Sequence, residues 1–336
     1  MHYGIIHSNN SNLILCSSLP FINQDKLPKR FTLINEGDLI LADTSEDRKD
    51  AAKGIEIINQ SNAQILSGLH TIHLREKTPC TIPGFKTYYV ASKSFRNFAR
   101  KYCEGIKVFS IKPSLLKYTH FAYPQNKNEQ FMIVDFLNKI EDKKAILEKK
   151  IYILKKYKEG FTKILTKTLN TDEIALSNIC SITTGKMDAN ALNPQGKYKF
   201  FTCSREDYFI DNYAFDCEAL LVSGNGDVGL TKYYNGKFNA YQRTYVLYNL
   251  KKNAKFIKLF IDLQINTIIR KETNKGAMPY IRLTTFNKIM IPNIDPSLEY
   301  LISAAIDKID KKIELLQNHA RVLNNIKNNL LDSLFI

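Results

Sequence analysis

The sequence predicts an α+β protein in which two similar mixed α/β domains alternate with two long helices. The helices are expected to pair as an antiparallel coiled coil, with an approximate two-fold relation between the halves of the chain. Two observations support this fold class: two stretches repeat apolar residues in heptads, and most of the chain reads as one unit that occurs twice. The expected segments are a first domain at 1–125, a helical spacer at 126–168, a second domain at 169–293 and a second spacer at 294–336.

Length and composition agree with a folded protein of two domains. The 336 residues suffice for two domains of ordinary size, and 44% of them are hydrophobic and 11% aromatic. No apolar run of about 18 residues could span a membrane, and the start MHYGIIHSNN lacks the pattern of a secretory signal. We therefore expect a cytoplasmic protein with no membrane partner.

The six cysteines form no recognisable ligand or disulfide pattern. They show no CxxC spacing and no histidine partner at metal-site distance, so neither a zinc site nor a disulfide framework is expected. The two histidines of HTIH (70–73) are three residues apart on a predicted strand, where such side chains face opposite sides. No metal is therefore expected.

The net charge gives the first indication of a partner. A formal charge of +15 and a pI of about 9.3 favour binding to a polyanion, and nucleic acid is the usual one. An anionic membrane or an acidic protein would also be attracted, and enrichment in Lys, Asn and Ile can reflect an AT-rich genome. Charge alone leaves these alternatives open.

Two long stretches carry the heptad pattern. Their apolar residues recur in steps of three, four and seven, and the second seam lies 169 positions after the first. Such a seam must be covered, and the nearest cover is the other helix of the same chain. The seam residues are Ile133, Leu137, Ile140, Leu147 and Leu154 in the first stretch and Ile302, Ile306, Ile309, Leu316 and Leu323 in the second.

Matches away from the seam indicate that the two helices belong to one repeat. At the same offset, Lys158 corresponds to Lys327, and both occupy an inward-facing heptad position where lysine is unexpected. Glu141 corresponds to Asp310 in the same way.

The repeat continues upstream, with offsets that drift by a few residues as loops change length. The paired segments are YGIIHS (3–8) with YKFFTC (198–203), GDLILA (37–42) with EALLVS (218–223), LSGLHTIHL (66–74) with NAYQRTYVL (239–247), and 105–124 with 276–292. Runs such as DLILA and RTYVLYNL are expected to be strands, whereas 256–271 is an amphipathic helix with 93–103 as its equivalent. The stretch 171–197 has no counterpart, so the first domain is expected to be either naturally short or without its beginning.

Two basic domains attached to a rigid pair of helices suit the reading of two short DNA segments with an unread gap between them. Because the two domains differ in sequence, the halves of such a site would also differ.

With these features the chain resembles the specificity subunits of type I restriction-modification systems, the HsdS family. The resemblance rests on a domain that closes twice with a Gly-led stretch, a strand ending in Pro and a heptad helix, as in YPQNKNEQFMIVDFLNKIEDKKAIL (123–147) and IPNIDPSLEYLISAAIDKIDKKIELL (291–316). It covers nearly the whole chain. Glu299 stands where the first copy has Gln130, and the short first domain departs from the family pattern.

The resemblance implies a chain without a catalytic centre that reads a bipartite, asymmetric target in double-stranded DNA. It also implies binding to two methyltransferase subunits, which use S-adenosylmethionine, and through them to restriction subunits. No cofactor would be bound by this chain itself. In agreement, the sequence lacks a GxxxxGK[ST] phosphate loop, an Asn-Pro-Pro-aromatic signature and a recognisable nuclease cluster.

Candidate DNA contacts follow from side-chain chemistry in polar turns and strand ends. Arg, Lys, Asn and Gln can read bases in the major groove, whereas Ser, Thr and Lys more often hold phosphates. The candidates are Arg205, Asn225, Gln242 and Arg243 as readers and Lys186 and Lys275 as phosphate contacts in the second domain, and His7, Asn9, Ser45, Arg48 and His70 in the first. For each residue, a solvated loop or a structural hydrogen bond is the alternative. The glycine-rich SGNGDVG (223–229) is expected to be a plain β-turn.

Two other functions stand as alternatives. One is a nuclease or methyltransferase whose motifs are not apparent, which turnover by the isolated chain would reveal. The other is a coiled-coil adaptor for nucleic acid or acidic proteins, unrelated to restriction. Salt-sensitive binding to duplex DNA separates this adaptor from a DNA reader.

Overall fold

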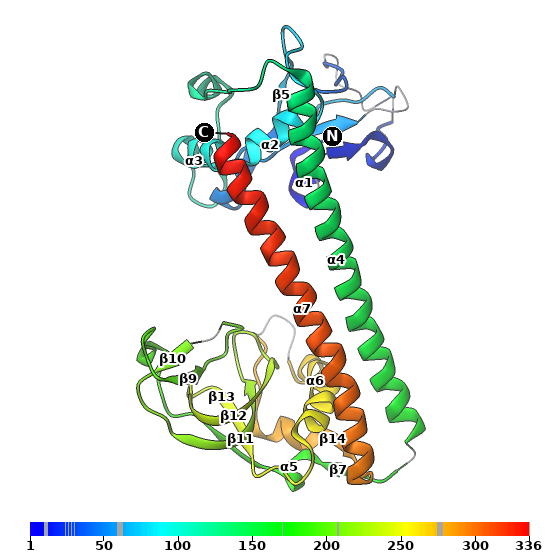
Figure 1. Ribbon diagram of the computed structural model, residues 1–336, viewed down its shortest axis with the longest axis vertical. Coiled ribbons are helices and arrows are strands. Elements are labelled where there is room, and N and C mark those ends of the chain that lie inside the picture. The colour runs from blue at the N-terminus through cyan, green and yellow to red at the C-terminus, as the bar shows by residue number, and fades with distance from the viewer. Residues whose placement is uncertain are drawn as a thin grey trace. The chain divides into compact units, whose positions relative to one another are not determined.

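The structure is a computed structural model that describes residues 1–9, 13–23, 25, 27, 29, 31–58, 63–169, 171–206, 208–273 and 278–335 (Figure 1). The chain forms two compact units. The first unit consists of Met1–Glu148 and Gln317–Ile336, and the second of Lys149–Leu316. The long helices α4 (Lys127–Thr168) and α7 (Pro296–Leu334) are both divided between the two units. The two long helices and the α+β class are as the sequence predicts.

The first unit is built on a four-stranded sheet with the order β1-β4-β2-β5. Strand β1 is parallel to β4, and the other neighbours are antiparallel. The unit also contains a separate two-stranded sheet, formed by β3 and β6. The elements of this unit before α4 are α1 (Tyr3–Ser8), β1 (Leu13–Leu15), β2 (Leu39–Ala42), β3 (Thr44–Ser45), β4 (Gly54–Ile58), β5 (Thr71–Leu74), α2 (Phe85–Ala91), α3 (Lys93–Tyr102) and β6 (Phe109–Ser110), with short 3-10 helices at Cys16–Ser18, Arg48–Asp50 and Pro113–Tyr118.

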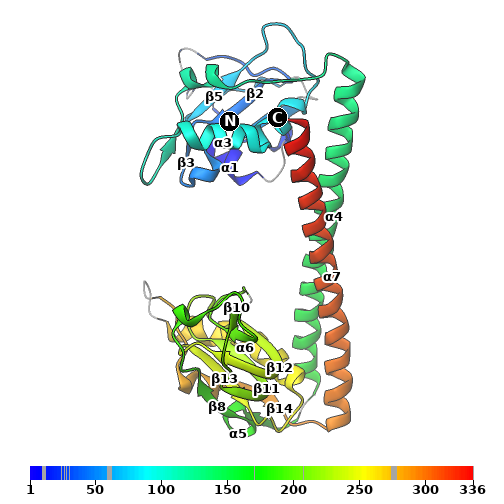
Figure 2. The same cartoon turned by 60° about the vertical axis from the view of Figure 1, so that its left-hand side comes forward.

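Two short helices and the end of α7 pack with the sheet and the start of α4 in one core cluster of the first unit. The Ser92 hydroxyl accepts a hydrogen bond from the Phe95 amide at 3.4 Å, which caps the start of α3 directly after α2. Helix α2 is buried along most of its length. Its Phe85 ring lies 5.3 Å from the ring of Phe335, so the last turns of α7 complete this core (Figure 2).

The second unit is built on a six-stranded sheet with the order β10-β9-β12-β11-β13-β8. Strand β9 is parallel to β12, and the other neighbours are antiparallel. The elements of this unit before α7 are β7 (Glu173–Ala175), α5 (Leu176–Ile179), β8 (Ser181–Thr184), β9 (Tyr198–Phe201), β10 (Tyr208–Ile210), β11 (Phe215–Ser223), β12 (Thr231–Ala240), β13 (Thr244–Tyr248), α6 (Ala254–Glu272) and β14 (Met290–Pro292), with 3-10 helices at Ala189–Ala191 and Leu283–Lys288.

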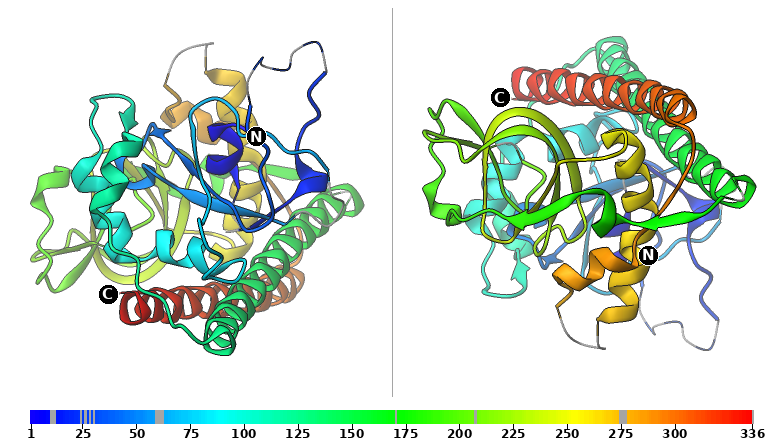
Figure 3. Two further views of the ribbon diagram at one scale, coloured as in Figure 1. Left: turned by 90° about the horizontal axis from the view of Figure 1, so that it is seen from above. Right: turned by 90° about the horizontal axis from the view of Figure 1, so that it is seen from below.

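Helix α6 covers one side of this curved sheet (Figure 3). The Asn253 side chain accepts hydrogen bonds from the Lys255 and Phe256 amides and so caps the first turn. The apolar face of the helix, with residues such as Phe260 and Ile265, is fully buried against the sheet. The predicted helix at 256–271 is confirmed. In the part of the chain that the structure describes, no helix is long and apolar enough to cross a membrane.

In the first unit, the beginning of α4 and the end of α7 run antiparallel. Lys327 Nζ lies 2.5 Å from Glu141 Oε1. One turn further along α4, Lys144 Nζ donates to Asn324 Oδ1 at 3.4 Å. The residue number of the partner on α7 falls as the residue number on α4 rises, which shows that the two helices are antiparallel here.

In the second unit, Lys158 Nζ lies 2.7 Å from Asp310 Oδ2. Lys158 and Lys327 are counterparts in the repeat, as are Glu141 and Asp310. The same ion pair therefore forms once in each unit, with the roles of the two helices exchanged. All ten predicted seam residues are buried or half-buried, as a covered seam requires.

The strand register confirms the repeat. Leu39 pairs with Leu74 between β2 and β5, and Leu220 pairs with Leu247 between β11 and β13. The sequence alignment predicts that Leu39 corresponds to Leu220 and Leu74 to Leu247. The two sheets therefore share the same pairing, residue for residue, at their centres.

The closing segments repeat in the same way. Ile111 donates its amide hydrogen to the Asp43 carbonyl at 2.9 Å, and Ile281 donates to the Gly224 carbonyl at 3.0 Å. A six-residue 3-10 helix begins two residues after each isoleucine. This confirms the predicted match of 105–124 with 276–292 where both are described.

The predicted match of YGIIHS with YKFFTC is wrong. Residues 3–8 form the helix α1, whereas residues 198–201 form the strand β9. The His2 ring accepts a hydrogen bond from the Gly4 amide at 3.1 Å and caps this short helix. The true counterpart of β9 is β1, since each is the strand parallel to its neighbour in the sheet.

The first unit also differs from the prediction in its domain helices. Residues 93–102 are helical as predicted, but α2 precedes them, and the two helices together follow the sheet as α6 does in the second unit. Among the described residues, the first sheet ends at β5, and the counterpart of β5, β13, carries β8 on its outer side. Strand β8 belongs to the stretch 171–197, which has no counterpart in the repeat.

Candidate nucleic-acid interface

Four segments of the second unit meet at one end of the sheet. They follow β8, β9, β11 and β12, and three backbone hydrogen bonds join them: Gln242 to Met187 at 3.0 Å, Gly224 to Arg243 at 2.9 Å and Tyr241 to Phe201 at 2.9 Å, with the amide named first in each pair. We call the segments 185–188, 202–206, 224–229 and 241–243 the second-unit loop cluster. Five of the six candidate contacts of the second domain fall in it.

Glycine permits the close approach of these loops. A Cβ on Gly185 would lie 2.0 Å from the Ala240 carbonyl oxygen, and one on Gly224 would lie 2.6 Å from the Arg243 carbonyl oxygen. No other residue type fits such distances without moving the backbone. Gly185 and Gly224 therefore allow the loops of the cluster to pack against one another.

The candidate side chains of the loop cluster reach solvent. Lys186, Arg205, Gln242 and Arg243 are exposed, and Asn225 is half-buried. The Arg205 side chain is 78% exposed and its Nε lies 3.5 Å from Asp227 Oδ1, a loose pair that leaves the guanidinium open to another acceptor. Lys275 lies outside the described residues.

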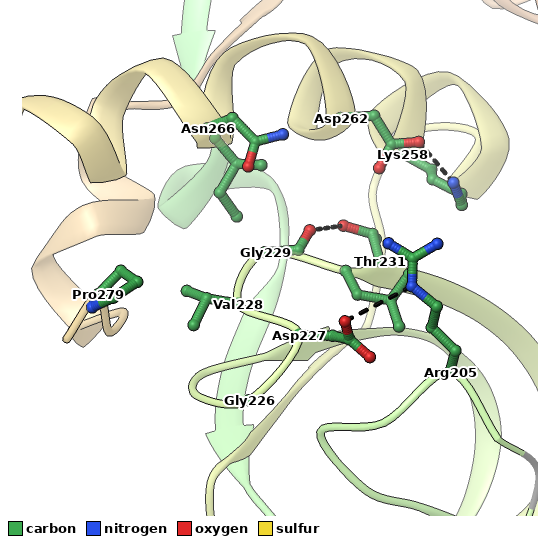
Figure 4. A pocket seen from close by; sticks show the side chains of 12 residues that line it. Arg205, Gly226, Asp227, Val228, Gly229, Thr231, Lys258, Asp262, Asn266 and Pro279 are labelled. Atoms are coloured by element: carbon green, nitrogen blue, oxygen red, sulfur yellow. Dashed lines mark hydrogen bonds and ion pairs between the residues drawn. The ribbon is translucent and has the colours of Figure 1, made fainter. Parts of the chain in front are cut away.

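A cavity of about 540 Å³ opens beside the loop cluster, between the 226–229 turn and α6 (Figure 4). Two ion pairs line it: Arg205 with Asp227, and Lys258 with Asp262 at 2.5 Å. These cations are matched by the same number of carboxylates, so the cavity wall attracts a polyanion less than the open face of the cluster does.

In the first unit, the rings of His7 and His70 both contact the ring of Tyr3. The ring centroids are 6.2 Å and 5.4 Å from that of Tyr3, and both contacts are edge-to-face. His7 Nε2 donates to the Thr44 carbonyl at 2.7 Å, and His70 Nδ1 lies 3.3 Å from Asp43 Oδ1. These two candidates are therefore brought together at the end of β2.

The other candidates of the first domain have structural partners. The Asn9 carbonyl accepts a hydrogen bond from Lys53 Nζ at 2.8 Å. Ser45 is buried, and its hydroxyl accepts from the Asp47 amide at 3.1 Å. Arg48 is exposed and donates to the Arg100 carbonyl from NH2 at 3.0 Å. Contact of any candidate with DNA stays a prediction.

Gln130 and Glu299 are equivalent in the repeat, and the sequence did not reveal that they anchor the long helices. Gln130, fully buried at the start of α4, accepts from the Ile82 amide at 2.9 Å and donates to the carbonyls of Cys80 at 2.9 Å and Pro124 at 2.6 Å. Its counterpart Glu299 is paired with Lys252. Each residue ties the start of a long helix to the loop before a domain helix.

Comparison with known proteins defines the class of the second unit. Residues 169–325 match the family described as the type I restriction modification DNA specificity domain. The loop cluster lies inside this range. The match begins at the end of α4 and continues through most of α7, so this part of the chain is similar to a type I restriction modification DNA specificity domain.

A second comparison finds a curated relative that resembles part of the chain. Over 142 residues the chain is 37% identical to the type I restriction enzyme EcoDI specificity subunit of Escherichia coli, which is 42% of this chain and 31% of that subunit. The chain thus matches about a third of this relative's length. The resemblance to the type I specificity subunits, HsdS, that the sequence indicated is confirmed.

Solved structures confirm the fold. The S subunit of a type I restriction-modification system from M. genitalium aligns with a TM-score of 0.61 over 98% of this chain and 89% of that one, at 17% identity. A chain from a study of complex assembly and conformational transition in a type I R-M system aligns with a TM-score of 0.53 at 14% identity, over 94% of this chain and 85% of that one.

Proposed function

We propose that this chain recognises a bipartite, asymmetric target in double-stranded DNA as the specificity subunit of a type I restriction-modification complex. The observation that carries the proposal is the DNA specificity domain at 169–325. The first unit repeats its strand register and closing segment. Two domains of one design, each with exposed polar side chains at the same end of its sheet, suit a target with two halves.

The two halves of the target are expected to differ. At equivalent positions of the repeat, the first unit has Thr44 and His70 where the second has Asn225 and Arg243. Arginine pairs with guanine and asparagine with adenine through two hydrogen bonds, which threonine and histidine cannot form in the same way. The same backbone frame would therefore present different donors and acceptors to each half-site.

The long helices support a role as a scaffold for two copies of one partner. Apolar side chains away from the seam are exposed on α4 and recur as exposed apolar side chains 169 positions later on α7. The pairs are Phe131 with Tyr300, Met132 with Leu301, Ile146 with Leu315, Ile153 with Val322 and Tyr157 with Ile326. A repeated exposed apolar set favours two equivalent docking sites. The proposed occupants are two methyltransferase subunits, with the restriction subunits bound through them.

The proposal assigns no chemistry to this chain. S-adenosylmethionine would be held by the methyltransferase subunits, and the complex would act in the cytoplasm. The isolated chain is expected to transfer no methyl group from S-adenosylmethionine to mixed-sequence DNA and to cleave none with a divalent metal. Turnover without a partner subunit would contradict the proposal.

The decisive experiment selects duplexes from a randomised library with the chain and its methyltransferase. We expect two short fixed segments separated by an unread gap of fixed length. Insertion of one base pair in the gap should abolish binding, because the second half-site moves about 3.4 Å along the duplex and rotates with it. Binding that ignores gap length would refute the two-domain reading.

A further inference from the structure

Both units expose apolar side chains on the loop that precedes their closing 3-10 helix. In the first unit these are Ile106, 94% exposed, and Val108, 54% exposed. In the second unit the equivalent loop carries Met278, 88% exposed. Exposed apolar side chains are common, but recurrence in the same loop of a repeated domain calls for a physical reason.

In the first unit the loop is a rigid hairpin. Glu104 and Ser110 exchange backbone hydrogen bonds at 2.9 and 2.8 Å. Gly105 has a φ of 139°, and a Cβ there would lie 1.9 Å from the Val108 carbonyl oxygen. Only glycine allows so tight a turn. Ile106 is therefore held at the tip of the hairpin with its side chain in solvent.

This hairpin is continuous with a candidate reading segment. Its second strand pairs with β3, Ser110 opposite Thr44 and Phe109 opposite Ser45. Two candidate DNA contacts from the sequence, Ser45 and Arg48, lie in β3 and in the 3-10 helix after it, so the hairpin lies beside them. Lys107 at the tip is also exposed, which adds a positive charge beside Ile106.

In the second unit the loop joins the loop cluster directly. The Ile281 amide donates to the Gly224 carbonyl at 3.0 Å, and the Tyr245 hydroxyl donates to the Ile281 carbonyl at 3.0 Å. Pro279 lines the cavity beside the 226–229 turn (Figure 4). The Arg282 guanidinium lies 5.0 Å from the centroid of the Tyr280 ring, so a cation again accompanies the exposed apolar residue.

We propose that Ile106 and Val108 in the first unit, and Met278 in the second, enter a groove of the bound duplex and contact the bases beside each half-site. This inference rests on the proposed function. DNA is the occupant that fits, since each loop is joined to a predicted reading segment and carries a cation. A single side chain that projects from a loop can enter a groove 6 to 12 Å wide, where apolar side chains contact thymine methyl groups or base steps.

The test uses the full chain and a duplex selected by the wild type from a randomised library. The variants are Ile106→Ser with Val108→Ser, and Met278→Ser; Met278→Leu is the conservative control. Ile164→Ser on α4, where the side chain is 65% exposed and lies outside the proposed docking set, is the matched control for loss of an exposed apolar group elsewhere. Affinity is measured across a salt series, and methyltransferase binding is measured separately.

Each serine variant should weaken DNA binding by roughly ten-fold to a hundred-fold, the value of burying one apolar side chain. The slope of affinity against salt should not change, because no phosphate contact is lost. Met278→Leu and Ile164→Ser should bind DNA like the wild type. Thermal unfolding should be unchanged for all four, since the side chains are exposed.

Three results would overturn the inference. Serine variants that bind the duplex as tightly as the wild type would show that the loops do not contribute to DNA binding. A reduced salt slope would mean that the loops hold phosphates. Loss of methyltransferase binding with intact DNA binding would make the loops a protein contact. Failure of the wild-type chain to select any duplex would instead overturn the proposed function itself, and this inference with it.

Discussion

The anchor residue of α4 offers a sharp test of how the units are built. Gln130 is fully buried and makes three hydrogen bonds to the backbone of the first unit, one as acceptor and two as donor. The repeat places Glu299 at the same position in the second unit, where the partners are the Lys252 ammonium and the Asn253 amide. The two side chains have almost the same shape, so exchanging them tests hydrogen bonding and charge without changing the packing.

Gln130→Glu should destabilise the first unit. The carboxylate still accepts from the Ile82 amide, but it cannot donate to the carbonyls of Cys80 and Pro124. Two acceptors lose their donors and face a buried charge. A buried polar group left without its partner costs about 1–3 kcal/mol, so a loss of about 2–5 kcal/mol is expected. Glu299→Gln should destabilise the second unit, because Lys252 is only 10% exposed and loses its counter-charge.

Hydrogen exchange followed by mass spectrometry suits this test, since a chain of two units need not unfold in one step. Gln130→Glu should raise exchange in peptides covering α2 and the start of α4 and leave peptides covering β11 to β13 unchanged. Glu299→Gln should do the reverse. Gln317→Glu, at an exposed position of α7, is the control. Equal protection in Gln130→Glu and wild type would refute the role given to the three hydrogen bonds.

Three further predictions concern single contacts. Lys158→Asp should lower the stability of helix pairing by about 1 kcal/mol and Asp310→Lys in the same chain should restore it, as a double-mutant cycle in thermal unfolding would show. The pKa of Glu76 is about 2; burial opposes this, but hydrogen bonds to the carboxylate outweigh it. Its stabilising effect is complete above about pH 5 and fades as pH falls toward 2, so urea unfolding should depend less on acid pH in Glu76→Gln. Gly185→Ala should cost at least about 1–3 kcal/mol and weaken DNA binding, whereas Gly160→Ala, with open space around it, should be neutral or stabilising.

The sequence was sufficient where a pattern extended over many residues. The heptad seam continues over several turns, and its helices and pairing follow from the burial of one stripe. The register of the central strands could be predicted because the matched segments around Leu39 and Leu220 alternate in the same phase. In a strand, a shift of one residue would turn the buried face to solvent, so such a match has little freedom.

Some predictions that rested on a short segment or on a single residue were wrong. Six residues such as YGIIHS are too few to separate a period of 2 from one of 3.6, and the cap supplied by the His2 ring decided for a helix. Ser45 appeared to be an exposed turn residue, yet the pairing of β3 with β6 covers it. The meeting of the four loops in the second unit depends on sheet curvature and on the glycines at 185 and 224. A single sequence shows the glycines but not which loops they bring together.

Residues at the strand ends give the last prediction. His70 and Arg243 occupy the same place in the repeat, directly before β5 and β13, and the strands that follow them pair in the same register. The residues differ in side chain and also in backbone, because His70 has a φ of 56° and Arg243 has no positive φ. Arg243 is exposed, and Arg243→His should therefore leave the fold intact. Because histidine cannot form the two parallel hydrogen bonds that arginine makes to guanine, selection from a randomised library should change base preference in one half-site only. A change in both half-sites, or in neither, would contradict the assignment of this residue to base reading.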